Sequence, residues 1–270
     1  MGAFQVGIAL KPSSLGDDER SKLRSALSLL KLSEDIGLSH LVLDSEREVD
    51  DLSLKSIGLL AEEAGSTKLV VTVPVRRRDA RERFEGLRGL VAGSQGLVLC
   101  LVAGHPSYLD GGGPRVGAGA LLRAYAAEAA ELNGHGRELL VGTERVERAV
   151  LSLGWIRSVV PFVLMDSNSR LWAETFGRVW ERVAVYVPLF VGEPSEDAMA
   201  RMRAYVSRRP NYRGANGQDL EEGLRELTVF GRPEEVRARI ERLGEMGFGL
   251  VVGWLIDPSP EQLRRLSRAL

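Results

Sequence analysis

Short apolar runs alternate with longer amphipathic stretches along the whole chain. The apolar runs predict eight buried strands, at residues 4–10, 40–44, 68–75, 96–103, 138–141, 158–165, 184–191 and 249–255. These runs are almost continuously apolar, which is typical of parallel strands that are covered on both faces. The pattern therefore predicts a parallel sheet enclosed by helices.

The stretches between the runs carry apolar residues three and four positions apart, which predicts helices. We expect helices at residues 17–36, 50–64, 79–92, 116–132, 143–153, 170–182, 233–246 and 260–270, and a longer helical section at 195–227 that is interrupted near Pro210. Gly37 and Gly247 suit helix ends, and Pro233 suits a first helical turn. Eight strand–helix units favour one α/β domain over residues 1–270, a (β/α)8 TIM barrel with an extra helical insertion before the eighth strand.

Composition supports this fold and narrows the function. The 270 residues match the roughly 250 that such a barrel needs. The 36 basic and 37 acidic residues nearly cancel, so no nucleic acid partner is indicated. No apolar run approaches the ~20 residues of a membrane span, so we expect no membrane partner either.

The single cysteine, Cys100, cannot form an internal disulfide, which indicates a cytoplasmic location. No histidines or cysteines have metal-binding spacing, so we expect no metal site. Arginine outnumbers lysine, and Asn and Gln are scarce. This bias is typical of a thermophile, and a GC-rich genome is the alternative explanation.

Function in such barrels lies at the C-terminal ends of the strands. Asp44 follows the second strand, where a carboxylate can orient a substrate or move a proton; the alternative is that it caps the next loop. His105 follows the fourth strand and could exchange a proton; the alternative is an ordinary loop histidine. We therefore take Asp44 and His105 as the catalytic candidates.

Residues 76–78 form the only run of basic residues in the chain. The guanidinium groups of Arg76 and Arg77 suit a phosphate or a polyglutamate tail, because Arg donates two parallel hydrogen bonds. The alternative is a solvated loop whose arginines pair with Asp79 or Glu82. The run predicts an anion site or a charged structural loop.

Several segments, in order, resemble one family. They are SLLKLSEDIGLSHLVLDSE (28–46), LVVTVPVRRRDARERFEGLRGLVAGSQGLVLCLVAG (69–104), ELLVGTERVERAVLSLGWIRSVV (138–160), RPNYRGA (209–215) and FGRPEEVRARIERLGEMGFGLVVG (230–253). Together they resemble the bacterial luciferase-like barrels. That family includes flavin monooxygenases and reductases that depend on F-420 (coenzyme F420, a deazaflavin), such as methylenetetrahydromethanopterin reductase.

The resemblance implies an oxidoreductase that transfers hydride to or from a small organic substrate, with F-420 or FMN as cofactor. It places the cofactor ring near Pro74 and Gly104, where the family often has a cis peptide; we expect Val73–Pro74 to be trans. It places the phosphate tail at Arg76 and Arg77, or at Gly142 and Thr143 after the fifth strand.

The resemblance also implies a homodimer. The helix at 50–64 is apolar on more than one face, which a barrel surface alone does not require. We expect this helix to lie at the interface between two copies.

Two alternatives remain open at this stage. The glycine-rich loops of the family are reduced here, since only Gly104 is kept after the fourth strand and Glu144 follows Gly142 and Thr143. A degenerate, non-catalytic barrel without a cofactor would then act as a binding or partner subunit. The second alternative is a flavin-free enzyme that binds a phosphorylated substrate near Gly192 and Gly253.

Overall fold

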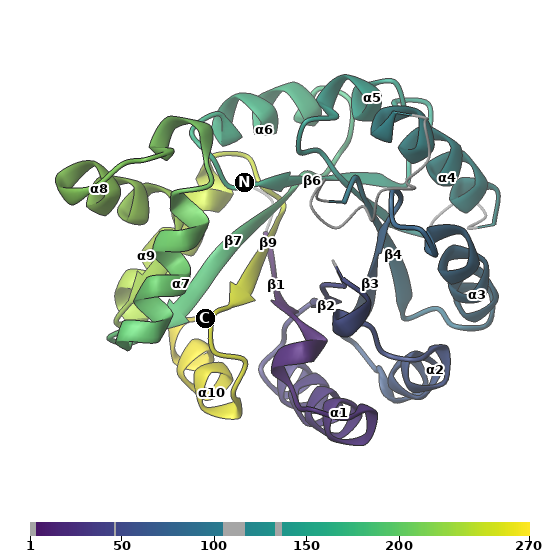
Figure 1. The fold of residues 1–270 in the computed structure, drawn as a ribbon, viewed down its shortest axis with the longest axis horizontal. Helices are drawn as coiled ribbons and strands as arrows, with labels where there is room; N and C mark the ends of the chain where they lie inside the picture. Colours follow the sequence, from purple (N-terminus) through teal and green to yellow (C-terminus); the bar gives the residue numbers. More distant parts are fainter. Residues whose placement is uncertain (1–3, 46, 105–116, 133–136) are drawn as a thin grey trace.

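The computed structural model describes residues 4–45, 47–104, 117–132 and 137–270, and it is a (β/α)8 barrel (Figure 1). The strands are β1 (Gln5–Leu10), β2 (His40–Leu43), β3 (Lys68–Pro74), β4 (Leu97–Val102), β5 (Leu139–Gly142), β6 (Val159–Leu164), β7 (Ala184–Val191), β8 (Val229–Gly231) and β9 (Leu250–Leu255). The eight predicted strands are all present, and only the short β8 was not predicted.

The strands are parallel, and eight of them close into a ring. Each of β1 to β6 pairs with the next strand, β6 pairs with β7, β7 with β9, and β9 returns to β1. β8 lies outside the ring and pairs only with the end of β7, where Leu189 is level with Val229. The ring brings the C-terminal ends of all eight strands to one face of the molecule.

Helices surround the barrel on its outer side (Figure 1). They are α1 (Glu19–Asp35), α2 (Leu54–Glu63), α3 (Ala80–Gly93), α4 (Ala118–Leu132), α5 (Glu147–Leu151), α6 (Ser169–Gly177), α7 (Glu196–Val206), α8 (Gly217–Leu227), α9 (Pro233–Glu245) and α10 (Pro260–Ala269), with short 3-10 turns η1 (Pro12–Ser14), η2 (Glu48–Asp50) and η4 (Pro210–Tyr212). α5 is shorter than predicted, because Arg145 takes a left-handed φ of 61° and delays the helix to Glu147.

Alternate residues of each strand belong to two separate layers of the core. Leu41 and Leu43 of β2 pack with the helices, whereas Val42 between them packs inside the barrel. The inner layer includes Ala9, Val70, Val98, Cys100, Leu140, Val160, Ala184 and Val252. This alternation follows from the period of two in a strand, and it decides which later residues of each strand face the barrel mouth.

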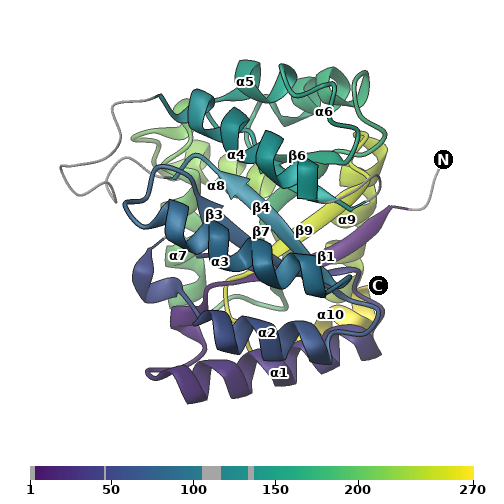
Figure 2. The same cartoon turned by 90° about the vertical axis from the view of Figure 1, so that its right-hand side faces the viewer.

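The predicted insertion before the last barrel strand is present and lies at the edge of the barrel, beside β7 (Figure 1). It consists of α7, η4 and α8, and Gly214 and Gly217 with positive φ values of 78° and 53° separate η4 from α8. Figure 2 shows α7 on the same side of the barrel as η1, which follows the end of β1. The insertion therefore adds side chains to the face where the strands end.

The opposite end of the barrel is joined by buried charges. Glu138 precedes β5, and its side chain is only 4% exposed. It accepts hydrogen bonds from His40 Nε2 at 3.1 Å and from Lys68 Nζ at 2.6 Å, and it also pairs with Arg182. These contacts link the starts of β2, β3, β5 and β7.

None of the described helices combines the length and apolar character needed to cross a membrane.

Candidate functional site

The inward-facing layer nearest the strand ends forms the barrel mouth, which faces the reader in Figure 1. Strand alternation predicts one further inward-facing residue on each of several strands, either near the end of the strand or, as for Phe162 and Tyr186, within it. These residues, here called the mouth layer, are Lys11, Asp44, Pro74, Gly142, Phe162, Tyr186 and Trp254. Three of the predicted site residues, Asp44, Pro74 and Gly142, thus lie on one face of the barrel.

Asp44 and Tyr186 face each other across the mouth layer. The phenol of Tyr186 donates a hydrogen bond to Asp44 Oδ2 at 2.9 Å, and both residues are half-buried. The backbone N–H of Asp44 donates to the carbonyl of Leu10 at 2.8 Å, which holds the residue at the rim. A carboxylate paired with a phenol can accept, hold and return a proton.

Cys100 lies in the inner layer of the core, below this pair. Burial, together with the negative charge of Asp44, raises the pKa of the thiol well above its usual range. The thiol therefore stays protonated, and a protonated thiol is a poor nucleophile.

Aromatic rings line one wall of the mouth. The ring of Trp254 lies 6.4 Å from that of Tyr186 and 6.4 Å from that of Tyr205 in α7, and Phe162 meets Tyr186 edge-on at 5.7 Å. Lys11 Nζ lies 5.5 Å from the centre of the Trp254 ring. The wall presents flat apolar surface with a cation at its edge, which suits a planar, polar-edged molecule.

The sequence analysis missed Tyr186, Phe162 and Tyr205. The first two could have been found from alternation, because Tyr186 stands two residues after the inward-facing Ala184 and Phe162 two after Val160. Tyr205 carries no such signal, since it lies in the insertion and its contact with Trp254 depends on how α7 packs against the barrel.

The glycines at the rim keep space beside the mouth layer. Gly104 has a φ of 80°, and a Cβ there would lie 3.2 Å from the Cβ of Pro74. A Cβ at Gly142 would lie 3.0 Å from a methyl group of Val102. Thr143 is buried beside Gly142, and its N–H donates to the carbonyl of Phe162. The described residues contain no cis peptide, so Val73–Pro74 is trans as expected.

The two neighbouring arginines after β3 have different surroundings. Arg77 is only 6% exposed, and its guanidinium donates to Asp79 and to Asp51 at 2.6 Å each. Burial lowers the pKa of Arg77, but the hydrogen bonds and charges of Asp79 and Asp51 outweigh it and raise that pKa above the usual range. The paired-loop alternative therefore describes Arg77.

Arg76 lies beside Gly104 at the rim and is half-buried, with no ion pair to any of the residues described. Its guanidinium is thus the member of the basic run that is available to an anion. His105, the second catalytic candidate, lies outside the described residues.

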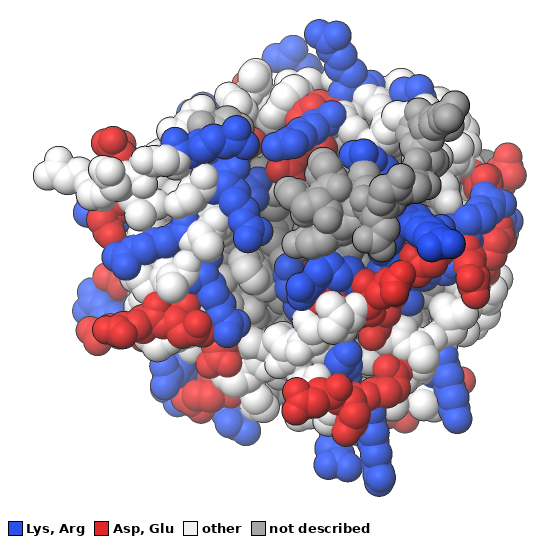
Figure 3. Space-filling view, in the orientation of Figure 1, with Lys and Arg blue, Asp and Glu red and all other residues white. Residues whose placement is uncertain are grey.

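Basic side chains border the recessed centre of this face (Figure 3).

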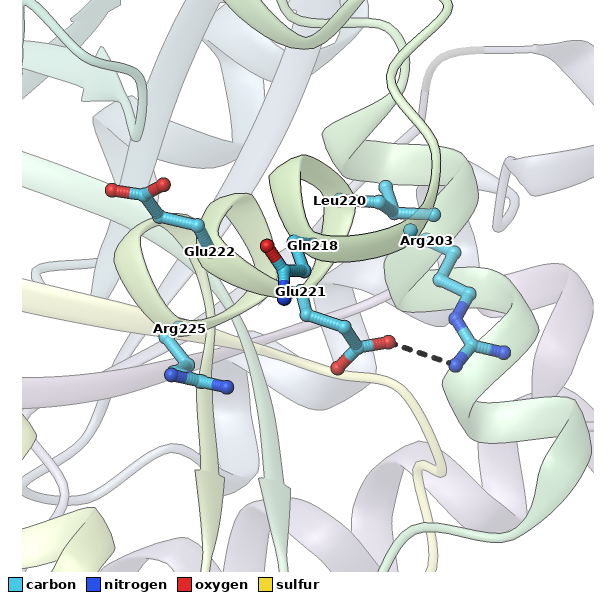
Figure 4. Close-up of a pocket in the computed structure, with 7 residues that line it drawn as sticks. Arg203, Gln218, Leu220, Glu221, Glu222 and Arg225 are labelled. Carbon is cyan, nitrogen blue, oxygen red and sulfur yellow. Dashed lines mark hydrogen bonds and ion pairs between the residues drawn. The ribbon is translucent and has the colours of Figure 1, made fainter.

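Further hollows lie away from the mouth layer. One, beside α8, is shown in Figure 4; its Arg203 and Glu221 pair with each other at 3.0 Å, and both are about half exposed. Exposed, mutually neutralised charges of this kind do not form a catalytic site.

A second hollow lies between the ends of β7 and β9, where the phosphorylated-substrate alternative would place its anion. Its two arginines are already paired, Arg201 with Asp197 at 2.9 Å and Arg265 with Glu261 at 3.0 Å. Within the described part of the chain, no three His, Cys, Asp or Glu side chains are grouped as a metal site would require.

Comparison with known sequences identifies relatives over nearly the whole chain. The model of a family of unknown function, DUF7388, matches residues 18–261. The uncharacterized protein MJ1239 of Methanocaldococcus jannaschii is 27% identical over 265 residues, which are 97% of this chain and 98% of that protein.

Solved structures with the same fold include an F420-dependent reductase and a monooxygenase in complex with FMN. The coenzyme F420-dependent tetrahydromethanopterin reductase of Methanopyrus kandleri superposes with a TM-score of 0.73 at 14% identity, over 99% of this chain and 97% of the reductase. The oxygenating constituent of 3,6-diketocamphane monooxygenase from Pseudomonas putida, in complex with FMN, has a TM-score of 0.67 at 12% identity, over 98% and 96%. The likeness to the luciferase-like barrels that the sequence motifs indicate is thus confirmed at the level of the fold.

Proposed function

The chain belongs to the family of unknown function DUF7388, and we propose that it is an oxidoreductase that uses F-420 or FMN to transfer hydride to or from a small organic substrate. The observation that carries this proposal is the Asp44–Tyr186 pair, hydrogen-bonded at 2.9 Å within an aromatic mouth. It stands on a fold shared with F420-dependent and FMN-binding oxidoreductases.

The residues of the mouth fit such a cofactor. Trp254, Tyr186 and Phe162 offer flat surfaces for a tricyclic ring, and the positive φ of Gly104 (80°) leaves the backbone open beside Pro74. F-420 or FMN supplies the hydride-transfer chemistry when bound, because no protein side chain carries it.

The residues of this chain supply binding and proton transfer. The Asp44 carboxylate accepts a proton near the reacting centre, and the Tyr186 hydroxyl, which donates to Oδ2, orients the carboxylate. Arg76 binds the phosphate tail from the rim, with the loop at Gly142 and Thr143 as the alternative position, whereas Arg77 holds the loop after β3 through Asp51 and Asp79. His105 is proposed as a second proton-transfer group.

Titration of the purified protein with FMN and with F-420 tests the proposal. We expect one of the two to change its fluorescence saturably, with a dissociation constant in the micromolar range. The absorption spectrum of gently purified protein shows independently which cofactor is bound. If neither cofactor responds at high micromolar concentration, the proposal is wrong, and stoichiometric co-purification of another chain would then support the partner-subunit alternative.

Arg76→Ala and Arg78→Ala form a matched pair for the phosphate-binding role. Both remove one positive charge from the same loop, but Arg78 is fully exposed. We expect Arg76→Ala to weaken cofactor binding about tenfold, because an arginine–phosphate contact contributes on the order of 1.4 kcal/mol. Arg78→Ala should change the dissociation constant less than about twofold. Equal effects would show that the loop contributes only general charge.

We further propose that the protein is a cytoplasmic homodimer from a thermophilic source. α2 contributes the support for the dimer, since Leu54 and Leu59 are 38% and 41% exposed on this helix. Large apolar side chains that stay exposed on a surface helix are typical of an interface.

A further inference from the structure

Arg209 is a cation held in place over the barrel mouth. Its side chain is only 11% exposed, and its guanidinium carbon lies 4.3 Å from the centre of the Tyr205 ring. Tyr205 is itself immobilised, because it is buried and its hydroxyl donates to the carbonyl of Met165 at 2.9 Å. Arg209 therefore presents its donors in a fixed direction, next to the Tyr205–Trp254 part of the aromatic wall.

The hydrogen-bonding capacity of the Arg209 side chain is only partly used within the described part of the protein. Its Nε is buried and has no acceptor, and one Nη meets Glu144 only at 3.3 Å. A buried donor without a partner costs about 1–3 kcal/mol, and such groups are rare unless water or a ligand satisfies them. The unpaired Nε thus indicates an acceptor from outside the described residues.

Glu144 is an easily displaced partner. It is 55% exposed, so solvent screens its attraction to Arg209, and pairs of this kind contribute roughly 0–1 kcal/mol. Asp166, the acid at the end of β6, does not compete, because its carboxylate accepts from the N–H of Asn168 at 2.8 Å and from Ser169. A ligand anion can therefore replace Glu144 without displacing a buried carboxylate.

We propose that Arg209 is an anion-binding residue of the mouth, and that it takes a carboxylate or phosphate group of a bound molecule in place of Glu144. The shared chemistry is an oxyanion that accepts hydrogen bonds from a guanidinium. That this anion belongs to the substrate rests on the proposed function, whereas anion binding itself does not.

The direct test is calorimetric titration with inorganic phosphate and with succinate at constant ionic strength. We expect Arg209→Gln to weaken binding of at least one of these anions tenfold or more. Arg208→Gln, the exposed neighbour with the same charge change, should alter binding less than twofold. Arg209→Lys keeps the charge but not the fork and should give an intermediate loss, and circular dichroism checks that each variant is folded.

Glu144→Gln provides a change in the opposite direction. Removing the competing carboxylate should tighten anion binding about threefold or more, while a purely structural Arg209–Glu144 pair would give no gain. Unchanged anion affinity in both Arg209→Gln and Glu144→Gln would overturn the inference.

Comparison of FMN with riboflavin identifies the source of the anion. If Arg209→Gln weakens FMN but not riboflavin, the anion is the cofactor phosphate; if only succinate binding is lost, it is a substrate carboxylate. Both results support the site. If phosphate or succinate binding depends on Arg209 while neither FMN nor F-420 binds, the inference stands and the proposed function fails.

Discussion

Two adjacent arginines show how a single position changes the role of a side chain. Arg76 continues the inward alternation of β3 and borders the mouth beside Gly104, whereas Arg77 points between loops and joins Asp51 to Asp79. The same loop therefore provides both an available guanidinium and a buried structural one. Residue type alone could not distinguish them, because the partner Asp51 lies 26 residues away.

At the residue scale we expect Arg77→Ala to lower the free energy of unfolding by about 3 kcal/mol, because it leaves two partly buried carboxylates without their partner. Arg76→Ala should change it by less than about 0.5 kcal/mol, as is usual for rim residues. Urea denaturation monitored by tryptophan fluorescence measures both. Equal losses in the two variants would contradict the assignment of separate roles.

At the element scale, Glu138 joins the starts of four strands. It precedes β5 and accepts hydrogen bonds from side chains at the starts of β2, β3 and β7. Burial alone would raise the pKa of Glu138, but the hydrogen bond from His40 and the charges of His40, Lys68 and Arg182 lower it to about 2. Burial conversely lowers the pKa of His40, although the hydrogen bond to Glu138 opposes that shift. The carboxylate thus holds the closed end of the barrel together in its ionised form.

The lowered pKa of Glu138 predicts a pH-dependent contribution to stability. The shift from 4.5 to about 2 corresponds to about 3 kcal/mol at neutral pH. Because the folded-state pKa lies below the unfolded one, this contribution is complete above pH 4.5 and is lost as the pH falls towards 2. Glu138→Gln should therefore be less stable than wild type at pH 7, and the difference should vanish in acid.

Denaturant unfolding at several pH values measures this prediction. Glu245→Gln is the matched control, since Glu245 is exposed and should behave like wild type throughout. A Glu138→Gln deficit that does not depend on pH would show that the side chain contributes by packing rather than by charge.

At the scale of the whole molecule, the proposed dimer gives the exposed apolar residues of α2 a function. Leu59→Glu places a charge on the proposed interface, and we expect it to yield monomers, because an unpaired charge buried between two copies is costly. Leu171→Glu is the control, since Leu171 is 57% exposed on α6, away from α2. Sedimentation velocity distinguishes the outcomes, and a wild type that is monomeric at all concentrations would rule out the dimer.

The amino-acid sequence alone was sufficient to predict the barrel, because the relevant signals are local. Continuous apolar runs indicate strands covered on both faces, and amphipathic stretches ended by glycines such as Gly37 and Gly247 indicate the helices between them. The ends of the apolar runs place Asp44, Pro74 and Gly142 at strand ends, and strand ends form the mouth of any such barrel. That part of the site required no knowledge of contacts.

The pairing of side chains was decided only by the tertiary structure. Asp44 and Tyr186 are 142 residues apart, and Arg209 and Glu144 are 65 apart. They meet because β9 pairs with β1 and closes the ring, and because α7 places Tyr205 against Trp254 at the end of β9. Local periodicity fixes which way a side chain points from its own strand, but contacts across the barrel depend on closure, which no local pattern encodes.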